Sequence, residues 1–465
     1  MKEIIWKTKF EPFKIKVTEP IAVSTAAQRL DAIKKAYYNT FNIPAARVTI
    51  DFLTDSGTGS MSQTQWGALM CGDESYAGAN SFYHMRDAVQ NITGCKYVIP
   101  VHQGRAAERI LMGVIAAQKP GQTIISNAHF DTTRANVEAN KMEALDIPVK
   151  EAWEYGKPGP FKGNMDIAKL KKLIKEHGAK NIPLVIMTVT NNTMGGQPVS
   201  MANIKETAAV CKAAGIPMFL DCARFAENAA FIKQREKGYA NKSPMQIAKE
   251  MFSYAQGCWM SSKKDALVNM GGFLAFKQDS AWAQKSRESL ILGEGFLNYG
   301  GMSGRDMEAL ATGIVEGLDE DYLNYRLEST RYLGEGLLKA GVPIINPPGG
   351  HAVYIDVKKF LPDFNQNAFP AQSLVCHMYK MGGIRAVEIG MLMFGRRDAK
   401  GKWIPAEMEL VRLAIPRKVY TKSHFDYVIE VMAHIAKNKK EIKGLAVDWA
   451  PAALAHFSAR LRELK

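Results

Sequence analysis

The strongest constraint on this fold is a series of short, continuously apolar segments that alternate with helical patterns between residues 80 and 280. Pro183–Val189 and Ile216–Leu220 are two such segments, and each is bordered by a helical pattern. A strand that is apolar on both faces needs helices on both faces, which is typical of a parallel sheet. The sequence therefore predicts an α/β fold built on a mainly parallel sheet.

Several helix ends in this region are marked by capping residues. Asp166 is a good N-cap for a helix that Gly178 ends, and Ser200 is a good N-cap for a helix that Gly215 ends. Ser243 and the proline after it mark a third helix start. The predicted helices here are Ala26–Tyr38, Phe82–Ile92, Ala106–Ala117 and Ile167–Lys175, and the other predicted strands are Val48–Leu53, Lys96–Val101 and Thr123–Ser126.

The pattern changes near residue 310, which predicts a second domain. A chain of 465 residues is too long for one ordinary core. The last third suggests a small α+β domain with a long helix, two strands and a second helix, at Met307–Gly341, Ala352–Val357, Glu409–Ile415 and His424–Lys440. The predicted division is an N-terminal arm with part of the small domain at 1–53, a large domain at 54–310 and the small C-terminal domain at 311–465.

Composition excludes some classes of protein. The net charge of +14, from 60 basic and 46 acidic residues, fits a nucleic-acid binder or an enzyme for an anionic substrate. The basic residues are spread along helices rather than gathered in one patch, which favours a basic enzyme that binds no nucleic acid. No apolar run reaches the ~20 residues of a membrane span. Met1–Val17 lacks a secretory pattern, and the six cysteines form no CxxC pair, so we expect a cytoplasmic protein.

Two adjacent lysines interrupt the apolar stretch Cys258–Phe273. Lys263 and Lys264 lie in a polar turn between two buried runs. A buried ammonium must find partners or lose its proton, and lysines in that situation serve as Schiff-base nucleophiles. The alternative is a solvated turn with two surface lysines.

Polar residues follow several of the predicted strands, where ligands of parallel sheets bind. Gln103, Gly104 and Arg105 open a helix and offer backbone N–H groups to a phosphate, to which Ser261 and Lys263 could add a hydroxyl and a charge. The alternative is an ordinary strand-to-helix turn.

Three further residues suit an aromatic cofactor and an acidic substrate. Phe130 could stack on a heteroaromatic ring or simply pack in the core. Asp221 ends an apolar strand, so its charge needs a cation, either a protonated ring nitrogen or Arg224. Arg412 lies within an apolar strand, where it could bind a substrate carboxylate or form a structural ion pair.

Longer motifs carry a resemblance to a known family. They are Leu53–Thr58, Gly72–Gly78, Gly195–Asn203, Met260–Asp265 and Phe369–Ser373. With these motifs the chain resembles, from about Glu11 to its C-terminus, the β-eliminating lyases, the family of tryptophanases and tyrosine phenol-lyases. The resemblance implies pyridoxal 5′-phosphate (PLP) as cofactor and a large domain with the aspartate-aminotransferase fold (fold type I).

The resemblance also implies roles for individual residues. Lys264 matches the lysine that holds the cofactor as a Schiff base and acts as a base, and Tyr76 matches the tyrosine that transfers a proton to the leaving ring. Arg412 matches the arginine for the substrate carboxylate, with Thr54 and Asn192 nearby. The implied cofactor-binding positions are Gln103, Gly104, Arg105, Phe130, Asn192, Asp221, Arg224, Ser261, Lys263 and Lys264.

A monovalent cation and self-association are implied in the same way. The cation, K⁺ or NH₄⁺, would bind Glu74 and the backbone oxygens of Gly57 and Asn269, and an all-oxygen site suits a hard cation. The resemblance implies a homotetramer of dimers with shared sites, so Tyr76 and Glu74 would act on a neighbour's cofactor.

Three positions address the substrate. Asp131 can accept a hydrogen bond from an indole N–H, which is donor-only, whereas the phenol-lyases have threonine there. Ile389 stands where the phenol-lyases have an arginine, and His456 matches a tryptophanase histidine. All three favour β-elimination of L-tryptophan to indole, pyruvate and ammonia. The alternatives are a lyase for tyrosine or cysteine-type substrates, an aminotransferase of the same fold, and a nucleic-acid-binding protein.

Overall fold

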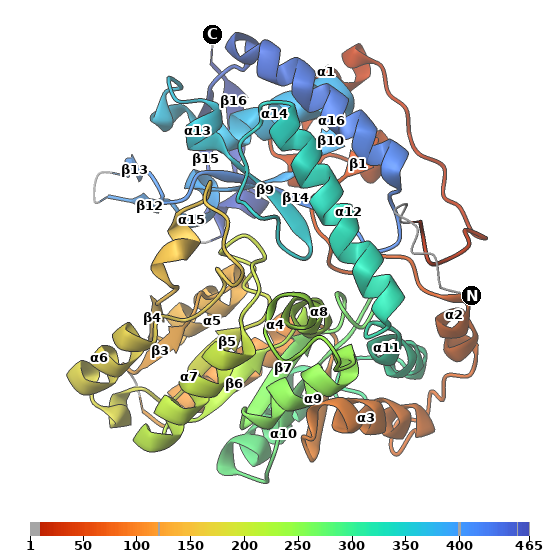
Figure 1. Cartoon of the computed structure of the whole chain (residues 1–465), viewed down its shortest axis with the longest axis vertical. Helices are drawn as coiled ribbons and strands as arrows, with labels where there is room; N and C mark the ends of the chain where they lie inside the picture. Colours follow the sequence, from red (N-terminus) through yellow and green to blue (C-terminus); the bar gives the residue numbers. More distant parts are fainter. Residues whose placement is uncertain (1–9, 120, 399–400, 453, 465) are drawn as a thin grey trace.

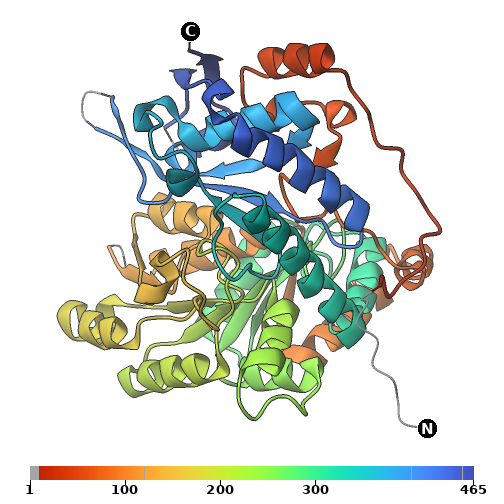
Figure 2. The same cartoon turned by 45° about the horizontal axis from the view of Figure 1, so that its top comes forward.

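The computed structural model describes residues 10–119, 121–398, 401–452 and 454–464. A large sheet with helices on both sides forms the lower part of the molecule in Figure 1, and smaller sheets with their helices form the upper part. The segment that precedes the first helix runs along one side of the molecule, from the lower to the upper part, in both views (Figures 1 and 2). The first nine residues of the predicted arm lie outside the described residues.

The helices and strands have the following bounds. The helices are α1 (Ala26–Lys35), α2 (Gln63–Met70), α3 (Asn80–Thr93), α4 (Gly104–Ala116), α5 (Asp131–Ala139), α6 (Ile167–His177), α7 (Met201–Ala214), α8 (Phe225–Arg235), α9 (Pro244–Ser253), α10 (Ala281–Gly293), α11 (Gly304–Glu316), α12 (Glu320–Lys339), α13 (Val357–Phe360), α14 (Pro370–Gly382), α15 (Met391–Phe394) and α16 (Lys422–Lys437). The strands are β1 (Ile50–Asp51), β2 (Tyr97–Val101), β3 (Thr123–Ser126), β4 (Glu143–Asp146), β5 (Val185–Thr188), β6 (Met218–Asp221), β7 (Gly257–Ser261), β8 (Gly272–Phe276), β9 (Ala352–Asp356), β10 (Ile384–Arg385), β11 (Val387–Ile389), β12 (Arg396–Arg397), β13 (Trp403–Ile404), β14 (Leu410–Ala414), β15 (Leu445–Trp449) and β16 (Arg460–Glu463). Within the described ranges, no helix has the length and apolar character needed to cross a membrane.

The large sheet has seven strands in the order β2-β8-β7-β6-β5-β3-β4. The pairs β7-β6, β6-β5, β5-β3 and β3-β4 are parallel, and β8 runs antiparallel to both of its neighbours. The predicted mainly parallel sheet is therefore confirmed. Because β2, β3, β5, β6 and β7 share one direction, the loops that follow them meet at one edge of the sheet.

The predicted helix caps are confirmed. The side chains of Asp166, Ser200 and Ser243 each accept a hydrogen bond from the backbone N–H three residues on, at the starts of α6, α7 and α9. Gly178 and Gly215 end α6 and α7, and both have a positive φ that a side chain would disfavour. These caps fix the lengths of helices that cover the large sheet.

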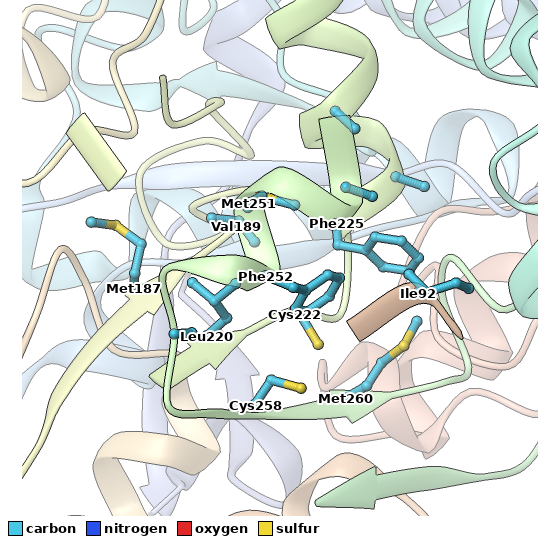
Figure 3. Close-up of a cluster of buried hydrophobic side chains, with 14 of the residues drawn as sticks. Ile92, Met187, Val189, Leu220, Cys222, Phe225, Met251, Phe252, Cys258 and Met260 are labelled. Carbon is cyan, nitrogen blue, oxygen red and sulfur yellow. The ribbon is translucent and has the colours of Figure 1, made fainter. Parts of the chain in front are cut away.

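Buried sulfur and aromatic side chains pack between the sheet and its helices. Cys222, Cys258 and Met260 come from the region of β6 and β7, and they lie near Phe225 of α8 and Phe252 of α9 (Figure 3). All six cysteines are free thiols. This packing holds the ends of β6 and β7, from which the candidate site is built.

The upper part contains a three-stranded antiparallel sheet in the order β11-β14-β9. Strand β1 pairs in parallel with β10, so the N-terminal segment joins the C-terminal part of the chain. A separate apolar core with Phe52, Leu374 and Phe425 lies between these strands and α12, α14 and α16. An α+β arrangement is therefore present, while the predicted boundaries at residues 53 and 310 stay a proposal.

The prediction of one long helix over Met307–Gly341 is wrong, because the chain forms α11 and α12 instead. Gly317 is the C-cap of α11, and a Cβ there would lie 1.9 Å from the carbonyl oxygen of Asp265, so glycine alone fits at this helix end. Asp319 then accepts a hydrogen bond from the N–H of Tyr322 at 2.8 Å and starts α12. The predicted strand Val48–Leu53 is also shorter than expected, since strand β1 covers Ile50–Asp51.

Two buried carboxyl groups beside the three-stranded sheet lead to a prediction about stability. Burial, followed by the charge of Glu409, raises the pKa of Glu388 well above its usual value, and burial raises the pKa of Glu409 to about 7. The unfolded chain loses these protons at lower pH than the folded protein, so stability falls as pH rises above about 4.5. Glu388→Gln removes one such group. We expect the free energy of unfolding of the variant, relative to that of the unsubstituted protein, to be higher at pH 8 than at pH 5 by roughly 1–3 kcal/mol.

Urea unfolding at pH 5, 6, 7 and 8 measures this difference. Exposed Glu407 supplies the matched control, and Glu407→Gln should follow the unsubstituted protein at every pH. If the free energies of unfolding of the unsubstituted protein and of Glu388→Gln change with pH by the same amount, the prediction is wrong.

Candidate active site

A cavity lies at the edge of the large sheet where the loops after the parallel strands meet. Its empty space measures about 570 Å³, including the part open to solvent. All the predicted cofactor-binding residues line it: Gln103, Gly104, Arg105, Phe130, Asn192, Asp221, Arg224, Ser261, Lys263 and Lys264. The structure thus brings this predicted set together in one cavity.

One end of the cavity suits an anion. Gln103 is the N-cap of α4, and Lys263 Nζ donates to Gln103 Oε1 at 3.2 Å. A Cβ on Gly104 would lie 2.7 Å from Ser261 Cβ, so only glycine lets the start of α4 touch the end of β7. In the part of the chain that the structure describes, neither Lys263 nor Arg105 forms an ion pair. Two cations and a helix N-terminus thus face a space that would accept a phosphate.

The two lysines of the polar turn are not simple surface residues. Both are partly buried. Burial, followed by the nearby Arg224 guanidinium, lowers the pKa of Lys264 to about 7. Burial, followed by the charge of Arg105, lowers the pKa of Lys263. Much of Lys264 is therefore neutral near pH 7, the form in which an amine is a nucleophile or a base.

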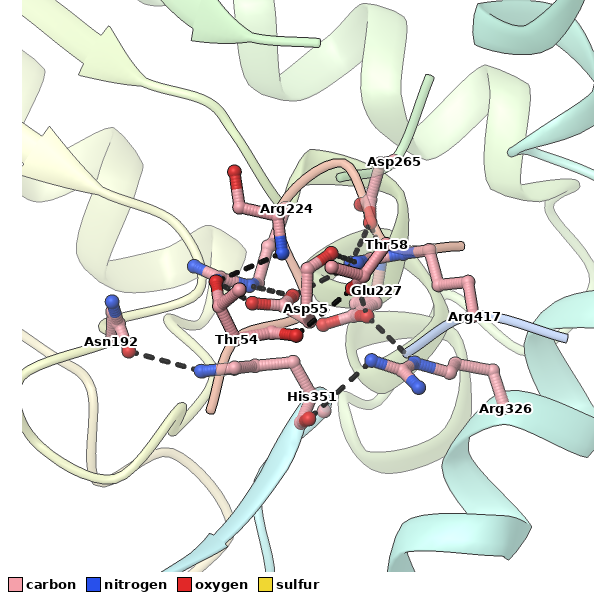
Figure 4. Close-up of polar contacts among 12 residues, drawn as sticks. Thr54, Asp55, Thr58, Asn192, Arg224, Glu227, Asp265, Arg326, His351 and Arg417 are labelled. Carbon is pink, nitrogen blue, oxygen red and sulfur yellow. Dashed lines mark hydrogen bonds and ion pairs between the residues drawn. The ribbon is translucent and has the colours of Figure 1, made fainter. Parts of the chain in front are cut away.

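Asp221 is a buried carboxyl group that lines the cavity. Burial raises its pKa despite the opposing charge of Lys264. Arg224, the alternative partner, instead binds Asp55 through Nε at 3.0 Å and Nη2 at 2.7 Å (Figure 4). No ion pair of Asp221 occurs among the described side chains. A cationic ring nitrogen in the cavity would satisfy it.

Asn192 is held in place through the oxygen of its side-chain amide. Its Oδ1 accepts a hydrogen bond from the Tyr354 hydroxyl at 2.7 Å. The same oxygen lies 2.9 Å from His351 Nε2 (Figure 4). For Nδ2 of Asn192, the described residues offer no hydrogen-bond partner. A donor at the cavity wall therefore remains for a ligand oxygen.

Arg412 is a buried guanidinium that pairs with no carboxylate of the described residues. It lies on β14, is 8% exposed, and its Nη2 donates to the Leu53 carbonyl at 3.4 Å. Its Nε has no hydrogen-bond partner among the residues that the structure describes. The alternative of a structural ion pair does not hold within the described ranges. Thr54 directly follows Leu53, so the predicted substrate-binding threonine lies close to the Arg412 contact.

The three predicted specificity residues converge from distant parts of the chain. His456 Nε2 lies 3.5 Å from Asp131 Oδ2, longer than an ordinary hydrogen bond, and both side chains are almost fully buried. Burial alone would raise the pKa of Asp131, but His456 and the Thr132 N–H hold it below its usual value. Phe41 contacts the His456 ring, and it packs against the apolar cluster that contains Ile389.

The predicted cation ligands are only partly assembled within one chain. Asn269 Nδ2 donates to the Gly57 carbonyl at 2.9 Å, so these two residues are adjacent. Glu74 instead accepts hydrogen bonds from Arg305 Nε and the Gly304 N–H, both at 2.9 Å. No cluster of three or more His, Cys, Asp and Glu side chains suited to a metal occurs in the described parts of the chain. The cation site stays a prediction.

Tyr76 does not line the cavity. Its side chain is 69% exposed and stacks on Phe296, with ring centroids 5.6 Å apart, and it meets the ring of Tyr299 edge to face. Its predicted role as an acid in a neighbouring subunit's site therefore stays a prediction.

Glu108 lines the cavity and was not expected there. It accepts hydrogen bonds from the hydroxyls of Thr132 at 2.8 Å and Thr133 at 2.9 Å, which ties α4 to the start of α5. Burial, followed by the charge of Asp221, raises the pKa of Glu108 to about 7. Its position one helical turn after Gly104, on the buried face of α4, is the signal that would have identified it.

Comparison with known proteins decides the family. Residues 51–431 match the family model described as "Beta-eliminating lyase". The chain belongs to the β-eliminating lyase family. It is 53% identical to a tryptophanase from Salinibacter ruber, covering 98% of this chain and 96% of that protein. It is also 48% identical to a tyrosine phenol-lyase from Symbiobacterium thermophilum, covering 98% of each.

Solved structures agree with this β-eliminating lyase on the fold. The chain superposes on a threonine aldolase from Leishmania major with a TM-score of 0.57 and 15% identity, over 83% of this chain and 99% of that one. It superposes on a serine palmitoyltransferase from S. paucimobilis, solved with bound PLP-myriocin, with a TM-score of 0.56 and 13% identity, over 84% and 87%. The predicted family and fold type are thus confirmed.

Proposed function

We propose that this β-eliminating lyase cleaves L-tryptophan to indole, pyruvate and ammonia with PLP as cofactor. The observation that carries the proposal is the contact of His456 with Asp131, 3.5 Å apart, because the two residues expected to recognise an indole ring occur together. Relatives named tryptophanase support the same substrate. Relatives named tyrosine phenol-lyase keep tyrosine as the main alternative.

The cavity fits PLP at three places. The anion end at Gly104, Arg105 and Lys263 would hold the phosphate, Phe130 would stack on the ring, and Asp221 would face the ring nitrogen. Bound PLP supplies an electron sink for the electrons released when the substrate Cα loses a proton.

The chain's own groups would bind the substrate and move its protons. The unpaired guanidinium of Arg412 binds the substrate carboxylate, and the free Nδ2 of Asn192 adds a hydrogen bond. Lys264 Nζ removes the Cα proton, since a pKa of about 7 suits a base at neutral pH. Because Arg412 lies on β14 and Lys264 follows β7, we propose that the upper and lower parts of the molecule close on the substrate.

The leaving indole needs a proton at C3 before it departs. Asp131 accepts the indole N–H and stabilises the positive charge that develops there, while His456 orients Asp131. Ile389 offers an apolar wall instead of a charge. We propose Tyr76 of a neighbouring subunit as the acid, which requires the homotetramer with shared sites. A K⁺ or NH₄⁺ at Gly57, Asn269 and a neighbour's Glu74 belongs to the same proposal.

Other reaction classes have distinct products. A transaminase would need an oxo-acid acceptor and would release no ammonia. A nucleic-acid-binding protein would show salt-dependent DNA binding and no absorbance from bound PLP. Pyruvate and ammonia formed in equal amounts from one amino acid support the lyase.

Asp131→Ala tests the substrate. We expect kcat/KM for L-tryptophan to fall about 10²–10³-fold, because a donor–acceptor contact at the developing charge is lost. For S-ethyl-L-cysteine, which has no indole N–H, the loss should stay within roughly 10-fold. Pyruvate release from both substrates measures the two values.

The control is Asp166→Ala, which removes an aspartate that caps α6 away from the cavity. It should leave both values unchanged. Equal losses for the two substrates in Asp131→Ala would contradict the indole contact, and faster pyruvate release from L-tyrosine than from L-tryptophan would overturn the proposed substrate.

A further inference from the structure

A buried cluster of charges lies between the two parts of the molecule, beside the cavity. We call it the buried charge cluster, and its members are Asp55, Arg224, Glu227, Asp265, Arg326 and Arg417 (Figure 4). Each member is at most 4% exposed. Three carboxylates face three guanidinium groups, so the charges balance.

Arg417 is the centre of the buried charge cluster. Its Nη1 donates to Asp55 Oδ2 at 2.8 Å, and its Nη2 donates to Glu227 Oε1 and Asp265 Oδ1, both at 2.7 Å. Arg224 and Arg326 each bind only one of these acids, Asp55 and Glu227 respectively. Arg417 is thus the cation that joins all three carboxylates.

The carboxylates of the cluster hold the turn that carries Lys264. Asp265 follows Lys264 directly, and its Oδ2 accepts hydrogen bonds from the N–H groups of Ala226 at 2.8 Å and Glu227 at 3.1 Å. Asp55 holds Arg224, which lines the cavity. A shift of Arg417 would therefore be passed to the Lys264 turn and to one wall of the cavity.

Arg417 also lies on the same segment as Arg412, five residues further along the sequence. Strand β14 contains Arg412 and ends at Ala414, and the chain leaves the strand through Pro416 to Arg417. The strand with the free guanidinium and the turn with the reactive lysine are thus connected through one buried side chain.

Stability alone does not account for such a cluster. Removing six charges from water is costly, and apolar side chains of similar size often stabilise a core equally well. A network with fixed directions and distances instead suits the holding of neighbouring groups in place.

We propose that Arg417 is a positioning residue that couples the strand carrying Arg412 to the turn carrying Lys264. When the substrate carboxylate binds Arg412, Arg417 holds Asp265 and thereby keeps Lys264 Nζ at the distance that proton removal needs. This rests on the proposed function for the roles of Arg412 and Lys264, but the coupling itself is a property of the protein's own contacts.

Arg417→Lys tests the coupling, since lysine keeps the charge but cannot bridge three carboxylates in a plane. We expect kcat to fall about 10–100-fold with KM changed less than roughly 3-fold, because a displacement near 1 Å can cost about 10²-fold in rate. We also expect faster amide hydrogen exchange at residues 262–268 of the full-length protein, with and without added PLP.

The matched control is Arg385→Lys, a buried arginine whose Nε donates to Asp51 at 3.0 Å in the upper part of the molecule. It should leave kcat and the exchange of residues 262–268 unchanged. An unchanged kcat in Arg417→Lys, or an exchange increase spread over the whole chain, would overturn the proposal.

A second variant keeps the test decisive if Arg417→Lys does not fold. Asp265→Asn retains an acceptor oxygen for the N–H groups of α8 but weakens the bond to Arg417, and it should show the same selective exchange and the same loss in kcat. Normal exchange and normal kcat in Asp265→Asn would count against the coupling. Exchange needs neither substrate nor cofactor, so selective exchange in a protein that does not cleave tryptophan would leave the coupling intact and refute only the proposed substrate.

Discussion

Replacement of Lys264 by alanine is expected to lower kcat for pyruvate release by roughly 10³-fold or more. The substitution removes the amine that would hold the cofactor and take the Cα proton, and a positioned base alone contributes about 10²–10⁴-fold. The burial that lowers the pKa of Lys264 to about 7 is the structural reason to assign this work to it. Stopped assays with L-tryptophan and with S-ethyl-L-cysteine should show the same loss, because the step is common to both.

The neighbouring lysine supplies the control for this experiment. Lys263→Ala also replaces a lysine by alanine, but the amine that it removes donates a hydrogen bond to Gln103 at the anion end of the cavity. It should weaken the binding of PLP, seen as a higher concentration needed for half-maximal activity, while kcat at saturating PLP falls less than about 10-fold. If the two alanine variants behave alike, the separate roles of the lysines are wrong.

Replacement of Arg412 by glutamine should raise KM about 10²–10³-fold for every amino-acid substrate. A desolvated guanidinium that binds a carboxylate contributes about 2–5 kcal/mol when its partner is present. The unpaired Nε and the lack of an ion pair in the described chain leave Arg412 available for that carboxylate. PLP binding, read from its absorbance, should be unchanged.

The competitor L-tryptophanamide, which lacks the carboxylate, separates this role from a general loss of structure. The unsubstituted protein should prefer L-tryptophan to the amide, and Arg412→Gln should bind the two about equally. Arg396→Lys, at an exposed site on β12, should behave like the unsubstituted protein. If Arg412→Gln still prefers L-tryptophan to L-tryptophanamide, another residue binds the substrate carboxylate.

Local patterns in the sequence predicted much of the large sheet. Thr123–Ser126 forms β3 as predicted, and the helix after Ser200 ends at Gly215 as predicted, because apolar runs and caps act over a few residues. The break between α11 and α12 was missed because the contact of Gly317 with Asp265 joins distant segments. The sequence did contain a glycine and an aspartate cap at this point.

Some residues of the candidate site could likewise be predicted from local sequence patterns, and others could not. The predicted cofactor-binding residues follow strands of the sheet that run in parallel, so their convergence in one cavity follows from the fold. His456 lies near the C-terminal end without any periodic pattern, and only the family resemblance indicated it. The pairing of Arg224 with Asp55 was not foreseen, since Asp221 is much nearer in sequence. The roles proposed for Tyr76 and Glu74 require a neighbouring subunit, which a single chain does not contain.

The place of β2 in the sheet has a consequence for synthesis on the ribosome. This edge strand ends at Val101, two residues before Gln103, and among the described strands its one partner is β8. Strand β8 starts roughly 170 residues after β2 ends, which at about 5–20 residues per second takes on the order of 10–30 s to translate. Until then the nascent chain has no partner for β2, and the anion end of the cavity lacks the strand that shapes it. We therefore expect that PLP binds only after β8 has been synthesised. A shortage of PLP would then leave complete, folded chains without cofactor, and it would not interrupt translation.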